Sequence, residues 1–144
     1  MISISQSASV LLLVRPSCFG SNPETAVSNL FQEFLTDNVS LSGKNEFNAF
    51  ADRLSNENIR SIIFEDDPSL QCPDAVFPNN WISMHHDGTV VLYPMMAPSR
   101  RRERRMDLIE KLKASGFDVR RVIDLCGYEG KDQFLEGTGS IIFD

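Results

Sequence analysis

The sequence has 144 residues and a formal net charge of −6 at pH 7, with 42% hydrophobic and 24% charged residues. This composition excludes a chain that is disordered throughout, and the length suits one compact domain. The acidic charge argues against wholesale binding to nucleic acid, because a polyphosphate would be repelled rather than attracted.

The first half of the chain predicts a strand, a helix and a second strand. Residues 10–14 are apolar and end at Arg15-Pro16, as is typical of a buried strand. A loop follows at 18–23; residues 24–36 are weakly helical, and 37–43 are polar and turn-prone. From Lys44 onward, the spacing i, i+3, i+4 and i+7 of Phe47, Phe50, Ala51 and Leu54 predicts a helix with one buried face. Residues 59–64 then predict the second strand.

The second half begins with a long loop at 65–80 that contains three prolines. Apolar runs at 81–84 and 89–93 flank His85-His86-Asp87-Gly88, and Asp-Gly between two such runs predicts a β-hairpin. We then expect a helix capped by Ser99 that runs to about Ser115 and stops at Gly116. Its apolar face should hold Met106, Ile109 and Leu112. A strand at 119–125, a loop at 127–132 and a strand that begins at 141–143 complete the prediction.

This order suggests a modular α/β architecture. Residues 81–125 form a strand–strand–helix–strand unit, and residues 10–64 resemble a looser first copy without any repeat at the level of residues. The last predicted strand begins just before the final residue, and a strand needs a partner. We therefore expect the chain to be the front part of something longer.

Two segments are candidates for chemistry. The long loop holds Asp74 and Asn79-Asn80 next to prolines, and carboxylates and carboxamides at strand ends can hold a planar nitrogenous group. Asx-turn chemistry explains the same residues equally well. The second segment, 134–140, places a glutamate before small residues that would let a ligand approach the backbone, but it also fits an ordinary turn and has neither dinucleotide nor P-loop spacing.

Four motifs together resemble the guanidino-group modifying enzymes. They are residues 73–81 (PDAVFPNNW), 87–95 (DGTVVLYPM), 101–105 (RRERR) and 134–140 (FLEGTGS). The similarity is strongest to the amidinotransferase or citrulline hydrolase branch, whose beginning also fits residues 14–16 and 22–25. The resemblance implies the pentein fold, an α/β-propeller built of strand–strand–helix–strand modules. Residues 1–144 would then be the N-terminal portion of a single pentein domain, about two blades and the start of a third.

The resemblance also implies roles for particular residues. Asp74 matches the acidic residue that borders the amidine-binding pocket, and Phe77 matches an aromatic residue that packs against it. Glu136 matches the acid that holds the substrate nitrogens and orients the general base. Asn80, with Asn79 beside it, stands where cation-binding members carry a carboxylate. Because an amide offers both a donor and an acceptor, Asn80 favours an uncharged ureido group such as that of citrulline over a guanidinium.

The nucleophile of that family is a cysteine assisted by a histidine, and both lie downstream of the Glu136 motif. None of Cys18, Cys72 and Cys126 matches it, so we expect these thiols to be buried or incidental. His85 and His86 are expected to be exposed at the hairpin tip, and no residues show metal-ligand spacing. We therefore expect no metal, no cofactor and half of a catalytic set.

The five arginines between Arg100 and Arg105 raise the possibility of nucleic-acid binding. They lack interleaved aromatic residues and belong to an acidic chain, so we interpret them as a solvated or module-packing face and expect no nucleic-acid partner. The three cysteines form no CxxC pair and leave one thiol over in any disulfide scheme, which favours a reduced protein. No signal peptide or membrane span is evident, so we expect a cytoplasmic protein without a membrane partner.

The leading hypothesis is a hydrolase fragment that acts on a ureido or guanidino substrate through cysteine attack with release of ammonia, and that is inactive alone. A non-catalytic remnant or a ligand-binding and assembly module is the alternative. In either case the expected partners are a small amidine or ureido molecule and, since open blade edges would be exposed, either the missing C-terminal part or a second copy of the chain.

Overall fold

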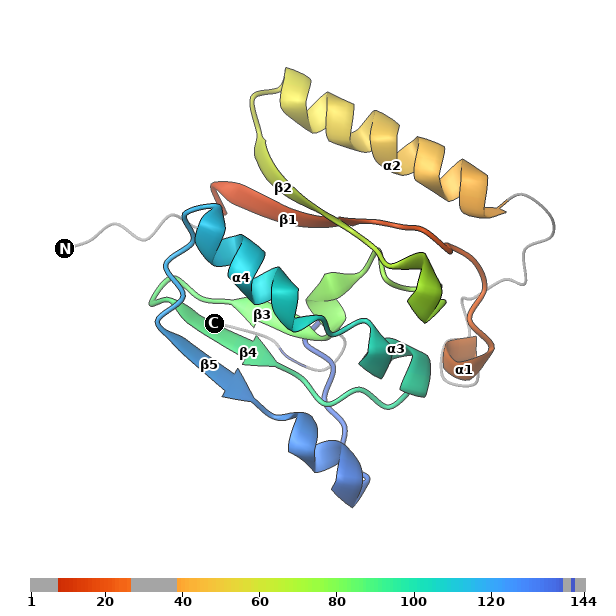
Figure 1. Cartoon of the computed structure of the whole chain (residues 1–144), viewed down its shortest axis with the longest axis vertical. Helices are drawn as coiled ribbons and strands as arrows, with labels where there is room; N and C mark the ends of the chain where they lie inside the picture. The colour runs from red at the N-terminus through yellow and green to blue at the C-terminus, as the bar shows by residue number, and fades with distance from the viewer. Residues whose placement is uncertain (1–7, 27–38, 139–140, 142–144) are drawn as a thin grey trace.

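The computed structural model describes residues 8–26, 39–138 and 141, which form two small sheets and their helices (Figure 1). The first sheet pairs β1 (Val10–Arg15) with β2 (Arg60–Glu65) in parallel, from Val10 opposite Arg60 to Arg15 opposite Glu65. Parallel neighbours need a crossover. The crossover contains α1 (Pro23–Ala26) and α2 (Val39–Asn56), and α2 packs on one side of this sheet.

The second sheet has the order β3 (Ile82–Met84), β4 (Thr89–Leu92), β5 (Arg121–Asp124). The strands β3 and β4 are antiparallel, with Ile82 opposite Leu92, whereas β4 and β5 are parallel. Between β4 and β5 the chain forms α3 (Pro98–Arg102) and α4 (Met106–Ala114). The predicted hairpin and the strand–strand–helix–strand order are therefore confirmed in this part of the chain.

The hairpin turn depends on Asp87 and Gly88. The carboxylate of Asp87 accepts hydrogen bonds from the backbone N–H and the hydroxyl of Thr89. Gly88 has a φ of +81°, and a Cβ there would lie 2.4 Å from the carbonyl oxygen of Asp118. Glycine is needed at this turn both for its backbone conformation and for the close approach of the segment that enters β5.

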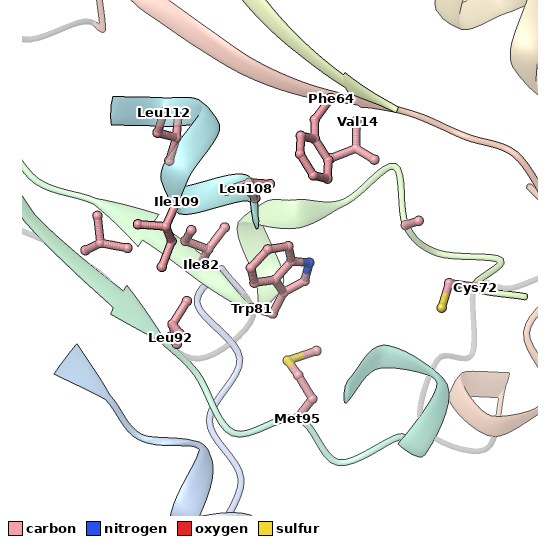
Figure 2. Close-up of a cluster of buried hydrophobic side chains, with 12 residues drawn as sticks. Val14, Phe64, Cys72, Trp81, Ile82, Leu92, Met95, Leu108, Ile109 and Leu112 are labelled. Atoms are coloured by element: carbon pink, nitrogen blue, oxygen red, sulfur yellow. The ribbon is translucent and has the colours of Figure 1, made fainter. Parts of the chain in front are cut away.

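One hydrophobic core joins the two sheets through α4, which lies between them (Figure 1). Figure 2 shows Leu108, Ile109 and Leu112 of α4 beside Ile82 and Leu92 of the second sheet. On the other side of the core, Val14 and Phe64 come from the first sheet, and the buried Trp81 and Met95 belong to the same cluster.

The predicted turn at 37–43 is wrong where it can be checked, because α2 already begins at Val39. Gly43 is tolerated inside this helix because Phe19 packs against it, so that a Cβ at Gly43 would lie 2.5 Å from the Phe19 ring. Phe47, Ala51 and Leu54 are buried as predicted, but Phe50 is 51% exposed. The predicted helix at 24–36 is observed over Pro23–Ala26, and residues 27–38 lie outside the described ranges.

The single helix predicted from Ser99 to Ser115 is divided into α3 and α4, with extended backbone at Arg105. The break shifts the buried face of α4 to Leu108, Ile109 and Leu112, and leaves Met106 61% exposed instead of buried. Nor is Ser99 the N-cap, since Ala97 holds that position. The predicted stop at Gly116 is confirmed: its φ is +88°, and Phe117 N–H donates to the Leu112 carbonyl as in a Schellman motif.

At the C-terminal end, residues 126–131 form a 3₁₀ helix where a loop was predicted. Ile141 has no strand conformation, and the other residues of the strand predicted at 141–143 lie outside the described ranges. Within those ranges, no helix is both long and apolar enough to cross a bilayer.

Candidate functional site

The segment between β2 and β3 is a loop that contains turns and two short 3₁₀ helices. Asp67 caps a 3₁₀ helix at Pro68–Leu70, and a second 3₁₀ helix spans Pro78–Asn80. The Phe77 N–H donates to the Asp74 carbonyl at 2.9 Å. These turns place four of the residues singled out from the sequence (Asp74, Phe77, Asn79 and Asn80) within seven positions of rigid backbone that ends at the buried Trp81.

Asp74 belongs to a polar cluster that the sequence did not reveal. The Nδ2 of Asn22, which is 1% exposed, lies 2.7 Å from Asp74 Oδ2 and 3.0 Å from Ser99 Oγ. The Thr25 hydroxyl lies 3.3 Å from the same Asp74 oxygen. Asp74 therefore receives two donors from the segment at the start of α1, both on one carboxylate oxygen, and is half-buried.

The same cluster supplies the cap of α3. The Ser99 backbone N–H donates to Glu24 Oε2 at 2.7 Å. Hydrogen bonds from Ser99 lower the pKa of Glu24, and the nearby Arg102 and Arg101 act in the same direction. A carboxylate from α1 thus satisfies one of the unpaired N–H groups at the start of a helix distant in sequence.

Asn79 and Asn80 direct their amide groups to one oxygen. The Nδ2 atoms lie 3.0 Å (Asn79) and 2.9 Å (Asn80) from the hydroxyl oxygen of Thr138. The Gly137 N–H donates to the Asn80 carbonyl at 2.7 Å. A Cβ on Gly137 would lie 2.6 Å from the Asn79 carbonyl oxygen, so glycine permits this segment to approach the loop. The small residue expected to admit a ligand therefore admits the protein's own backbone.

Glu136 lies between two residues that tie its segment to the rest of the molecule. The Leu135 N–H donates to the Pro94 carbonyl at 2.9 Å, and Gly137 is held by Asn80 as described above. Glu136 itself is half-buried. The backbone thus brings Glu136 beside the Asn79–Asn80 pair, although the two segments are more than fifty positions apart in sequence.

Arg100 connects Asn80 to the interior. Its guanidinium nitrogens lie 3.3 Å from Asn80 Oδ1 and 3.0 Å from the Phe77 carbonyl oxygen. Its Nε lies 2.7 Å from a carboxylate oxygen of Glu103, and the side chains of the pair are 6% and 1% exposed. This distance defines an ion pair, but the angles miss hydrogen-bond geometry, so no Glu103 oxygen accepts a well-directed hydrogen bond.

Burial raises the pKa of Glu103 to about 8, against the opposing effect of Arg100, because removing a carboxylate from water disfavours its charged form. The charges of Asp74 and Asp66 raise it further. Near neutral pH, Glu103 is therefore protonated in a substantial fraction of the molecules.

Phe77 faces a different surface. Its side chain is 46% exposed and, with Phe47, Phe50 and Phe19, lines an open groove of about 280 Å³ between the loop and α2. The structure thus joins Asn79 and Asn80 to the Glu136 segment, and links the Phe77 carbonyl to Asn80 through Arg100. The polar partners described for Asp74 belong to the separate cluster with Asn22.

Two of the three thiols, those of Cys72 and Cys126, are not activated nucleophiles. Burial raises the pKa of Cys72 to about 11 and that of Cys126 to about 12. Cys72 is buried as expected, and its Sγ lies 3.5 Å from the Ser99 carbonyl oxygen. A thiol with a raised pKa is protonated at neutral pH, whereas the thiolate is the nucleophile. All three cysteines are free of disulfides.

The predicted exposure of the hairpin-tip histidines is confirmed for His86 only. His85 is half-buried, and its Nε2 lies 2.9 Å from Ser83 Oγ. No group of three or more acidic, cysteine or histidine side chains within the described ranges could hold a metal ion.

The arginine run is a packing element rather than a solvated face. Arg100 is buried, and Arg104 forms a forked pair with Glu129, which also receives the Met95 N–H. The Arg105 guanidinium lies 4.5 Å from the centre of the Phe64 ring. The packing alternative of the sequence analysis therefore holds for these residues, and the solvated alternative is wrong for Arg100.

Several residues of this region were missed at the level of sequence: Asn22, Thr25, Ser99, Arg100 and Thr138. Asn22 and Thr25 fall in a quoted motif, but nothing marked them as polar partners of Asp74. Arg100 is one of five neighbouring arginines, and no local pattern distinguishes the buried one.

Comparison with known proteins gives one family match. The family of eukaryotic N,N dimethylarginine dimethylhydrolases matches residues 15–144, which is most of the chain. No curated protein was found to match.

Proposed function

The chain belongs to the eukaryotic N,N dimethylarginine dimethylhydrolase family, and on that premise we propose that it carries part of the substrate site of a hydrolase acting on a ureido or guanidino group. This family is one of the guanidino-modifying enzymes of the pentein fold. The small sheets and helices of the chain are consistent with part of such a fold. We propose, further, that its strand–strand–helix–strand unit is one propeller module, and that the chain is about two blades and the start of a third.

The observation that carries the proposal is the meeting of two amide groups beside Glu136. The Nδ2 donors of Asn79 and Asn80 converge on one acceptor oxygen, that of Thr138, at 3.0 and 2.9 Å. A ureido group presents an acceptor oxygen, which complements the two amide donors, and N–H donors, which in this proposal face the carboxylate of Glu136. A guanidinium presents donors only and lacks the oxygen that this pair would bind. These contacts support our proposal of a citrulline-type substrate preference.

In the proposed reaction, a cysteine thiolate adds to the ureido or guanidino carbon, the bond from this carbon to a terminal nitrogen breaks, and that nitrogen takes a proton and leaves as ammonia. Water then hydrolyses the C–S bond of the covalent adduct and releases the thiol, while Glu136 holds the substrate nitrogens and orients the general base. Asp74 and Phe77, to which the resemblance also gives roles at the pocket, lie in the Asn22 cluster and on the groove along α2, so the proposal rests on Asn79, Asn80 and Glu136. Cys72 and Cys126 are unsuited to the attack, because burial raises the pKa of both thiols. The chain alone should accordingly bind substrate without turning it over.

Titration with three ligands tests this function. The chain is titrated calorimetrically with L-citrulline, L-arginine and N,N-dimethylarginine, and the release of ammonia, or of dimethylamine from the methylated ligand, is measured in parallel. We expect saturable binding of L-citrulline, weaker binding of the two guanidinium compounds and no ammonia. Failure of all three ligands to bind would contradict the substrate site. Tighter binding of a guanidinium compound would contradict the ureido preference, and release of ammonia would contradict inactivity of the chain alone.

A binding or assembly module is the second candidate, and it has its own support. β5 is an edge strand of its sheet among the described residues, and three large side chains near the C-terminal end (Val122, Tyr128 and Phe134) are 40%, 46% and 37% exposed. An open edge and exposed apolar side chains favour pairing with another polypeptide. Such a module would associate with a separately encoded remainder or with a second copy, and binding without ammonia release would then be its complete activity.

A further inference from the structure

We propose that Arg100 is a positioning residue that sets the ligand preference of this site by fixing the orientation of the Asn80 amide. The inference rests on the proposed function and names the feature that makes the site suited to a neutral ureido group. Arg100 does not contact the ligand in this proposal; it acts through Asn80.

The orientation follows from the chemistry of the guanidinium. Arg100 has N–H donors and no acceptor, so the Asn80 atom that faces it at 3.3 Å must be the oxygen Oδ1. The NH₂ group of Asn80 then points the other way, to the Thr138 hydroxyl. If the amide rotated by half a turn, it would lose the Arg100 contact and place NH₂ against a cation, whereas the Thr138 hydroxyl could donate to the rotated oxygen; Arg100 therefore decides the orientation.

Arg100 is held firmly enough to impose this orientation. It is 5% exposed, its Nη2 donates to the Phe77 carbonyl at 3.0 Å, and its Nε lies 2.7 Å from a Glu103 carboxylate oxygen. Two acceptors of the loop, the Phe77 carbonyl and Asn80 Oδ1, thus use the planar fork of the side chain, and the close contact with Glu103 holds its Nε side. Lysine would keep the charge but has no fork, so it would hold Asn80 less strictly.

The consequence for a ligand has two parts. Asn80 and Asn79 both offer NH₂ donors to an incoming acceptor oxygen, as they do to Thr138. In addition, the Arg100 charge lies directly behind Asn80, in surroundings that are largely shielded from water. A ligand guanidinium would meet donors in front and a positive charge behind, whereas a ureido oxygen would meet complementary groups.

The test compares ligand preference and amide orientation in three variants. Arg100→Met combined with Glu103→Gln removes the cation without leaving a buried carboxylate unpaired. Arg100→Lys keeps the charge and removes the fork, and Arg102→Met changes an exposed arginine of the same helix as a matched control. Each protein is titrated with L-citrulline and L-arginine, and the side-chain amide signals of Asn80 are recorded by NMR without ligand.

For the wild-type chain we expect L-citrulline to bind about tenfold more tightly than L-arginine. The ratio should fall to within about threefold of unity in the double variant and take an intermediate value in Arg100→Lys. The Asn80 amide signals should move in both Arg100 variants, and Arg102→Met should leave signals and ratio unchanged.

The failure of this inference differs from a failure of the proposed function. If the wild-type chain binds neither ligand, the function fails and the inference with it. If it prefers L-citrulline and keeps that ratio in the folded double variant and in Arg100→Lys, the role of Arg100 is overturned while the function stands. Unchanged Asn80 amide signals in both Arg100 variants would overturn the positioning even before ligand is added.

Discussion

Between pH 4.5 and pH 8 the free energy of unfolding of the wild-type chain should fall by about 4 kcal/mol, and Glu103→Gln should remove most of this fall. Burial raises the pKa of Glu103 from 4.5 to about 8. In the unfolded chain the group ionises near pH 4.5, so between these values the unfolded state releases a proton that the folded state retains. Stability is therefore fully present below pH 4.5 and is lost as the pH rises through 8.

Other carboxyl groups act outside this window. Hydrogen bonds lower the pKa of Asp67, Asp87 and Asp124 from the ordinary value of 3.8, and that of Glu24 from 4.5. A lowered pKa gives stability that is present above the unfolded value and lost as the pH falls through the folded value. The loss from these residues thus lies below pH 4.5, and the slope between pH 4.5 and pH 8 reports on Glu103.

Chemical denaturation at a series of pH values, followed by circular dichroism, measures the effect. Glutamine mimics the protonated acid, so Glu103→Gln should be nearly as stable as the wild-type chain at pH 5 and more stable at pH 8. Glu110→Gln is the matched control, because the Glu110 side chain is 72% exposed on α4. A wild-type stability that rises over this interval, or an equal slope in Glu103→Gln, would show that Glu103 is ionised in the folded chain.

Asn80→Asp should reverse the ligand preference, moving the ratio of L-citrulline to L-arginine affinity by about tenfold or more toward L-arginine. The carboxylate would lie beside the Arg100 guanidinium and cancel the positive charge behind the site. It would also remove one NH₂ donor and offer an acceptor to a ligand guanidinium. Both changes act in the same direction.

Competitive titration of the two ligands against each protein measures this reversal. Asn45→Asp introduces the same charge on the exposed side of α2 and should leave the ratio unaltered. A preference that stays with L-citrulline in Asn80→Asp would contradict the role of the Asn80 amide. An equal shift in Asn45→Asp would show that net charge, and not the site, determines the ratio.

Local signals were sufficient for much of the fold. Asp87-Gly88 between two apolar runs predicted the hairpin, and Gly116 predicted the end of α4, because in both places the backbone needs a positive φ that glycine supplies at little cost. The apolar run at 10–14 and the strand-forming residues at 59–64 likewise predicted β1 and β2. These features depend on neighbours in sequence, and they were correct.

The errors arose where distant residues decide the structure. Arg104 and Arg105 leave the helix because the first pairs with Glu129 and the second packs on Phe64, and neither partner is visible from the helix sequence. Gly43 lies inside α2 because Phe19 needs the space. In the same way, the sequence pointed to Asn79, Asn80 and Glu136 through their motifs, but not to Thr138 or Arg100, which connect to them across the fold.

The most direct test of the proposed site is an NMR titration of the ¹⁵N-labelled chain with L-citrulline that follows the side-chain amides of Asn79 and Asn80 and the backbone amide of Gly137. We predict that these signals shift together, that their titration curves give the same dissociation constant for L-citrulline, and that they shift far less with L-arginine. Saturable shifts confined to other parts of the chain, with these three sets of signals unmoved, would contradict the assignment of the ligand to this site.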